Sequence, residues 1–171
     1  ACLAKGLRVI YTTPLKALSN QKLFEMRKRF GHVRCGLQTG DTSLNTEAQV
    51  VIMTTEILRN IMYRIAEEQS GGGGYLAGNS GDTVDSNSAA NLAARELRLG
   101  DVGLVVMDEV HYLADKHRGT VWEEAIINCP RHIQLLCMSA TVKNPDDLGA
   151  WISKEHMQCS TIKTSYRPVP L

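Results

Sequence analysis

Five short apolar segments recur along the chain, and polar or turn-forming residues separate them. They cover residues 6–12, 34–38, 49–53, 104–107 and 134–138. Short runs rich in Val, Ile and Leu are typical of buried β-strands. A weaker candidate for a last strand lies at residues 160–163.

Segments with helical spacing lie between these strands. We expect Thr13 to cap the first helix with Pro14 at its first position, because the first turn needs no backbone donor from proline. Its apolar stripe comprises Leu15, Leu18, Leu23, Met26 and Phe30, and Gly31 ends it.

Three later helices are predicted, and each has its own signal. One is capped by Thr54 or Thr55, one covers residues 119–127, and one begins at Asn144 and Pro145. Trp122 falls in the apolar pattern of the second, which favours core packing over base stacking. Leu148, Trp151 and Ile152 are expected to pack the third. Strands that alternate with helices predict an α/β fold of three layers with a mainly parallel sheet.

Two of the predicted strands end in chemically complementary groups. The strand at 104–107 runs into Asp108 and Glu109, and the strand at 134–138 runs into Ser139 and Thr141. Strands of this kind suggest neighbours in one sheet whose carboxyl ends share a crevice. One carboxylate could hold a hydrated Mg²⁺ while the other activates a water, as phosphoryl transfer requires. Alternatively, the two acids simply open the next helix, where they favour the helix dipole.

The residues in these blocks resemble a known family. Asp108-Glu109-Val110-His111 with Ser139-Ala140-Thr141 resembles motifs II and III of superfamily-two helicases of the DExH-box subgroup. Residues 12–22 resemble motif Ia, and residues 54–60 motif Ib, of superkiller-type RNA helicases, most like the plastid branch. The resemblance implies a RecA-like α/β/α domain of the P-loop NTPase class.

The resemblance also implies roles for individual residues. Asp108 would hold Mg²⁺ through water, Glu109 would activate the attacking water beside that metal, and both would bind ATP together with His111. His111, Ser139 and Thr141 would link the state of the nucleotide to the grip on RNA. Single-stranded RNA would be held through its sugar-phosphate backbone by Thr13, Pro14, Leu15, Lys16, Gly40, Asp41, Thr54, Thr55 and Glu56. Gly40 is expected to supply backbone freedom for its turn.

Charge and composition say less about function than the motifs do. The net charge is +1, but eight basic residues face one acid up to position 34. This segment fits either a polyanion contact or a solvated helix face. The five scattered cysteines favour a reduced intracellular compartment over a disulfide framework. The plastid resemblance suggests a chloroplast, with cytoplasm or nucleus as the alternative.

Residues 67–98 differ in character from the rest. They contain Gly71 to Gly74 and a scatter of Ser, Asn and Asp, so we expect a flexible surface insertion. The apolar runs are all too short to cross a membrane, and residues 1–5 lack the pattern of a secretory signal.

The 171 residues contain no G-x-x-x-x-G-K-[ST] motif, the loop that cradles nucleotide phosphates. They also begin without methionine, so we expect a longer parent that supplies this loop and a second RecA-like domain. The chain alone is then expected to hydrolyse ATP negligibly. Two alternatives stay open: a DNA helicase or translocase of the same superfamily, and a non-catalytic half-motor that binds nucleic acid.

Overall fold

The computed structural model describes residues 1–69, 99–140 and 142–164. Its strands are β1 Arg8–Thr13, β2 Cys35–Gln38, β3 Ser43–Leu44, β4 Val50–Thr54, β5 Val102–Met107 and β6 Gln134–Cys137. Its α-helices are α1 Lys16–Phe30, α2 Thr55–Gln69, α4 Gly119–Ile127 and α5 Pro145–Glu155. Short 3-10 turns are η1 Leu3–Lys5, η2 His32–Arg34, η3 Leu99–Asp101 and η4 Val110–Ala114.

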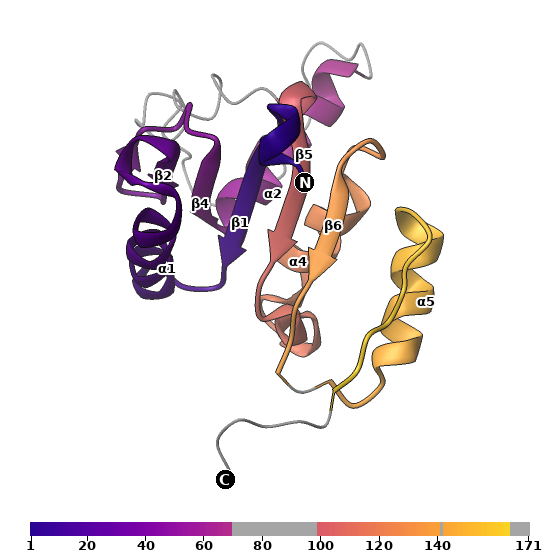
Figure 1. Cartoon of the computed structure of the whole chain (residues 1–171). Helices are drawn as coiled ribbons and strands as arrows, with labels where there is room; N and C mark the ends of the chain where they lie inside the picture. Colours follow the sequence, from indigo (N-terminus) through magenta and orange to yellow (C-terminus); the bar gives the residue numbers. More distant parts are fainter. Residues whose placement is uncertain (70–98, 141, 165–171) are drawn as a thin grey trace, which may run out of the picture.

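The strands form one sheet in the order β3-β2-β4-β1-β5-β6 (Figure 1). All neighbours are parallel except β2 and β3. We call the side where β1, β4, β5 and β6 end the carboxyl edge, and the side where they begin the amino edge. The mainly parallel sheet predicted from the sequence is confirmed.

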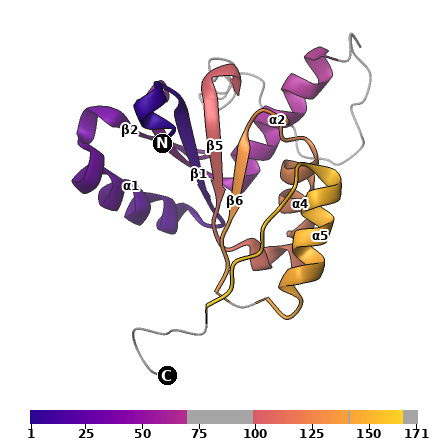
Figure 2. The same ribbon diagram turned by 45° about the vertical axis from the view of Figure 1, so that its right-hand side comes forward.

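Helices cover both faces of the sheet. Figure 2 shows α1 on one face and α2, α4 and α5 on the other. Alternate residues of β4 belong to two core layers, one on each face of the sheet. Val51 and Met53 pack under α2 and α4, whereas Val50 and Ile52 pack under α1. Trp122 is fully buried in the larger layer, as its spacing predicted. Residues buried on both sides fix the register of the central strands and hence the positions of their ends.

The predicted start of the first helix is wrong. α1 begins at Lys16, because Thr13 is still in β1, paired with Thr54 of β4, and Leu15 is extended at φ −139° and ψ 141°. A residue before proline disfavours helical torsions, which keeps Thr13 in the strand. The end of the helix is as predicted: Gly31 has φ 89°, and its N–H donates to Arg27 O at 2.9 Å.

The predicted stripe of α1 is only partly buried. Leu23 is buried and Met26 and Phe30 pack against the smaller core layer, but Leu15 and Leu18 are 46% and 36% exposed. Ser19, in the same turn as Leu18, is fully buried instead, so the buried face of this turn differs from the predicted stripe.

Other differences concern the chain beyond the core. Residues 160–163 form no strand and run irregularly beside α5. The backbone of α2 continues through residues 67–69, which were assigned to the Gly-rich insertion. The rest of that insertion, residues 70–98, lies outside the described residues. Asn144 and Pro145 open α5 as predicted, although the Asn144 side chain makes no capping bond. Within the described ranges, every helix is too short or too polar to cross a membrane.

Candidate nucleotide and nucleic-acid site

The acid pair stands at the end of β5 in a fixed geometry. The Asp108 N–H donates to Thr12 O at 3.1 Å, which extends the β1–β5 pairing by one residue. Both Asp108 carboxylate oxygens accept hydrogen bonds: Oδ2 from the Tyr11 hydroxyl at 2.6 Å, and Oδ1 from the Glu109 N–H at 2.9 Å. Burial, followed by the Asp108 hydrogen bond and charge, raises the pKa of Tyr11, so its hydroxyl stays a donor.

Glu109 turns the chain sharply. Its φ of 54° and ψ of 44° lie in the left-handed region, which costs a non-glycine residue about 1 kcal/mol or more. The turn ends the strand direction of β5 and starts η4. The acids therefore precede a 3-10 turn, and the Glu109 side chain does not cap it.

Glu109, His111 and Ser139 form a contact chain across two strands. The His111 Nδ1 lies 3.2 Å from Glu109 Oε2 and 3.4 Å from Ser139 Oγ. The backbones are joined as well, because Val110 N–H donates to Met138 O and Met138 N–H to Met107 O, both at 2.9 Å. The prediction that the acid and hydroxyl segments lie side by side is confirmed. Thr141 lies outside the described residues.

The two threonine turns lie at the same edge. Thr13 and Thr54 are direct partners in the β1–β4 register, with Thr13 in the strand next to β5 and Thr54 one strand farther from Asp108. Thr13, Thr54 and Thr55 are all buried, and two of their hydroxyls are bonded internally: Thr13 Oγ1 lies 2.6 Å from Ser19 Oγ, and Thr55 Oγ1 donates to Thr13 O at 3.3 Å. Any phosphate held here would therefore meet backbone N–H groups rather than these hydroxyls.

Lys16 and Asp41 are brought together beside these turns. Their charged atoms lie 3.1 Å apart, and both side chains are mostly exposed. A hydrogen bond from the Thr39 hydroxyl and the neighbouring Lys16 lower the pKa of Asp41. Among the described glycines, positive φ values occur only at Gly6 and Gly31, so the turn at Gly40 does not use a left-handed backbone. The exposed Leu15 lies next to this pair in sequence, and Pro14 is buried.

The basic N-terminal segment divides between the two edges. Lys16 lies at the carboxyl edge, whereas Arg27, Lys28 and Arg29 occupy the last turn of α1 near the amino edge, where they favour the helix dipole. Arg8 is buried, and its Nε donates to Ala48 O at 3.1 Å. The segment is therefore not one polyanion surface.

Two side chains at this edge were missed from the sequence. Tyr11 is one strand residue among apolar neighbours, and only the register of β1 against β5 sets it beside Asp108. Arg118 lies in the loop before α4, and its Nη2 donates to Pro14 O at 2.6 Å and to Glu56 Oε1. Neither residue type nor local spacing signals these partners.

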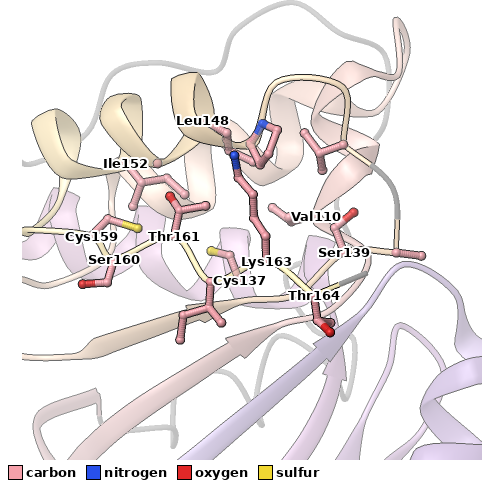
Figure 3. A pocket seen from close by; sticks show the side chains of 15 residues that line it. Val110, Cys137, Ser139, Leu148, Ile152, Cys159, Ser160, Thr161, Lys163 and Thr164 are labelled. Atoms are coloured by element: carbon pink, nitrogen blue, oxygen red, sulfur yellow. The ribbon is translucent and has the colours of Figure 1, made fainter. Parts of the chain in front are cut away.

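A cavity of about 740 Å³ lies on the α5 side of the hydroxyl segment (Figure 3). It is lined by Ser139 and Cys137 of the β6 segment, by Leu148 and Ile152 of α5, and by residues 159–164. Burial raises the pKa of Cys137 to about 12, so its thiol is a poor nucleophile. The acid pair does not line this cavity, so it is separate from the proposed nucleotide contacts.

Comparisons with known proteins identify the family of the chain. The family model "DEAD/DEAH box helicase" matches residues 2–148. The chain is 48% identical over 168 residues to the chloroplastic DExH-box ATP-dependent RNA helicase DExH15 of Arabidopsis thaliana, covering 98% of this chain and 12% of that protein. It is 40% identical to the ATP-dependent RNA helicase mtr4 of Schizosaccharomyces pombe, covering 96% of this chain and 12% of that protein.

A third relative and a solved structure extend the comparison. The probable helicase HelY of Mycobacterium leprae is 39% identical, over 99% of this chain and 15% of that protein. The structure of the Mycobacterium smegmatis helicase Lhr bound to ssDNA and AMP-PNP has a TM-score of 0.55 at 22% identity, covering 88% of this chain and 19% of that one. At that identity it shows the fold alone, a helicase RecA-like domain. The chain thus spans about an eighth of the length of the first curated relatives, and it belongs to the DEAD/DEAH box helicase family.

Proposed function

We propose that this chain is part of the first RecA-like motor domain of a longer, superkiller-type ATP-dependent RNA helicase. The observation that carries the proposal is the Glu109–His111–Ser139 contact chain at the edge that also holds both threonine turns. The 48% identity to a protein named as an RNA helicase supports it.

In this proposal the acid pair serves hydrolysis. Glu109 takes a proton from the attacking water, and its carboxylate contacts His111. Asp108 fits as a ligand of hydrated Mg²⁺, which binds through one or two carboxylates and substrate phosphates. When bound, the ion neutralises phosphate charge.

The opposite part of the edge serves nucleic acid. The turns at Pro14–Lys16 and Thr54–Glu56 present helix N-termini, with Gly40 and Asp41 beside the first. Backbone N–H groups bind phosphates without reading bases, so the contact is tolerant of sequence.

The relative named as chloroplastic supports a plastid location, which imaging of a fluorescent fusion of the full-length protein would test.

The deciding experiment compares nucleic acids. The full-length helicase would be assayed for ATP hydrolysis with matched single strands of RNA and DNA, because only RNA offers a 2′-hydroxyl. We expect stronger stimulation by RNA. Equal or greater stimulation by DNA would favour a DNA translocase, and no hydrolysis with either would favour a non-catalytic half-motor.

The hydroxyl segment provides a second test. Ser139 reaches His111 rather than Asp108, so it is placed to relay the state of the site rather than to do chemistry. Ser139→Ala combined with Thr141→Ala in the full-length helicase should weaken strand separation more than hydrolysis. Equal losses in both assays would remove the coupling role.

A further inference from the structure

Arg118 joins the two turns proposed to hold RNA. Its Nη2 donates to the backbone carbonyl of Pro14 at 2.6 Å and forms an ion pair with Glu56 at the start of α2. The Arg118 side chain is 32% exposed, so it is partly covered rather than on the open surface. Arg118 is 104 residues from Pro14 and 62 from Glu56 in sequence, so the contact closes a long loop.

The position of Arg118 is itself fixed by the segment that follows the acid pair. Its guanidinium lies 5.4 Å from the Tyr112 ring and 5.5 Å from the Trp122 ring, and these two rings stack at 5.2 Å. Its backbone N–H donates to Asp115 Oδ1 at 3.0 Å. Cation–π contacts and the turn together hold the side chain in one direction.

The backbone beside Arg118 leaves little room to move. A Cβ at Gly119 would lie 2.4 Å from Leu113 O, so α4 begins in close contact with η4. η4 in turn follows Glu109 directly. A displacement of the acid-pair segment would therefore also displace Arg118. Through its bonds to Pro14 and Glu56, Arg118 would in turn displace the two turns.

We propose that Arg118 is a positioning residue that sets the spacing of the Pro14 and Glu56 turns and ties that spacing to the segment after the acid pair. The inference rests on the proposed function, because only that function makes the two turns contacts to RNA. It assigns no chemistry to Arg118 itself. Arginine suits this position because its planar group can serve two acceptors while stacked on aromatic rings, which the point charge of lysine cannot do as well.

The test uses the full-length helicase with Arg118→Gln. Arg131→Gln is the matched control, because Arg131 Nη1 also donates to a backbone carbonyl, His156 O at 2.6 Å, but near the amino edge. ATP hydrolysis would be measured without RNA and over a range of single-stranded RNA concentrations. We expect Arg118→Gln to raise the RNA concentration for half-maximal stimulation by about 5-fold or more, the usual range of coupling between sites. RNA-independent hydrolysis should stay within about twofold, and Arg131→Gln should change neither.

Two further variants separate positioning from a general loss of folding. Arg118→Lys keeps the charge over the rings and should recover part of the RNA response. If Arg118→Gln is too unstable to assay, the RNA dependence of Arg118→Lys is measured in its place. Glu56→Gln combined with Arg118→Gln should lose less than the product of the single losses, as expected for residues in contact.

Arg118→Gln with wild-type RNA dependence, or with a shift no larger than that of Arg131→Gln, would overturn the inference while leaving the helicase assignment intact. A wild-type helicase that RNA does not stimulate would overturn the proposed function itself, and the inference with it.

Discussion

The two edges of the sheet use polar side chains in different ways. At the amino edge, Arg8 is buried against Ala48 O and Thr46 O, and Arg131 holds His156 O. At the carboxyl edge, Glu109, His111 and Ser139 are partly or largely exposed and contact one another. The two arginines at the first edge complete the fold, whereas Glu109, His111 and Ser139 at the second are left where a ligand can reach them. Substitutions at the amino edge should therefore change stability, and those at the carboxyl edge activity.

The largest effect is expected at Glu109. Glu109→Gln in the full-length helicase should lower RNA-stimulated ATP hydrolysis by about 10²- to 10⁴-fold, because an amide cannot accept the proton of the attacking water. Glu155→Gln, at the end of α5 near the amino edge, is the control and should hydrolyse ATP normally. A Glu109→Gln enzyme with normal turnover would break the comparison of the two edges.

Arg8→Met should have the next largest effect, on stability alone. The Ala48 and Thr46 carbonyls would lose a charged donor at a site where Arg8 is 6% exposed. We expect the free energy of unfolding of the 171-residue chain to fall by about 2 kcal/mol, measured by urea denaturation. ATP hydrolysis by the full-length variant should be unchanged, and a selective loss of hydrolysis would count against a purely structural role for this edge.

Tyr11→Phe sharpens the comparison because it removes one hydroxyl from the carboxyl edge and leaves the buried ring. Asp108 Oδ2 would lose its donor, so we expect hydrolysis to fall about tenfold, as for the loss of one hydrogen bond to a charged group. Binding of Mg²⁺ and nucleotide, measured by calorimetry, should weaken in parallel. Tyr63→Phe on the exposed side of α2 is the matched control and should affect neither quantity.

The smallest effect is a pH dependence from the amino edge. Burial lowers the pKa of His156 below its ordinary 6.5; a hydrogen bond to Pro130 opposes this shift and the charge of Arg131 adds to it. The unfolded chain then binds a proton more readily than the folded one, so this part of the stability is present above pH 6.5 and is lost as pH falls through the lowered pKa. Melting temperatures between about pH 7.5 and 5.5 should show the decline, and His156→Gln should flatten it. An unchanged slope in that variant would exclude His156 as its source.

Much of this architecture is determined by the sequence. Apolar runs separated by helical spacing predict the parallel sheet, and the polar residues after β5 and β6 must then meet at one edge, because parallel neighbours end together. Asp108, Glu109 and Ser139 are placed there for that reason. Thr13 and Thr54 come to the same edge, although local spacing predicted a helix cap at Thr13 where the sheet extended the strand instead.

The tertiary structure alone decided which polar groups face inward and which reach across the edge. Tyr11 meets Asp108 across 97 residues, and Arg118 meets Pro14 across 104. It also decided that the hydroxyls of Thr13 and Thr55 serve the fold and that Arg8 is buried at the far edge. Periodicity reports the face on which a residue lies, but partners of this kind depend on register and helix packing, which are fixed only when distant segments share one core.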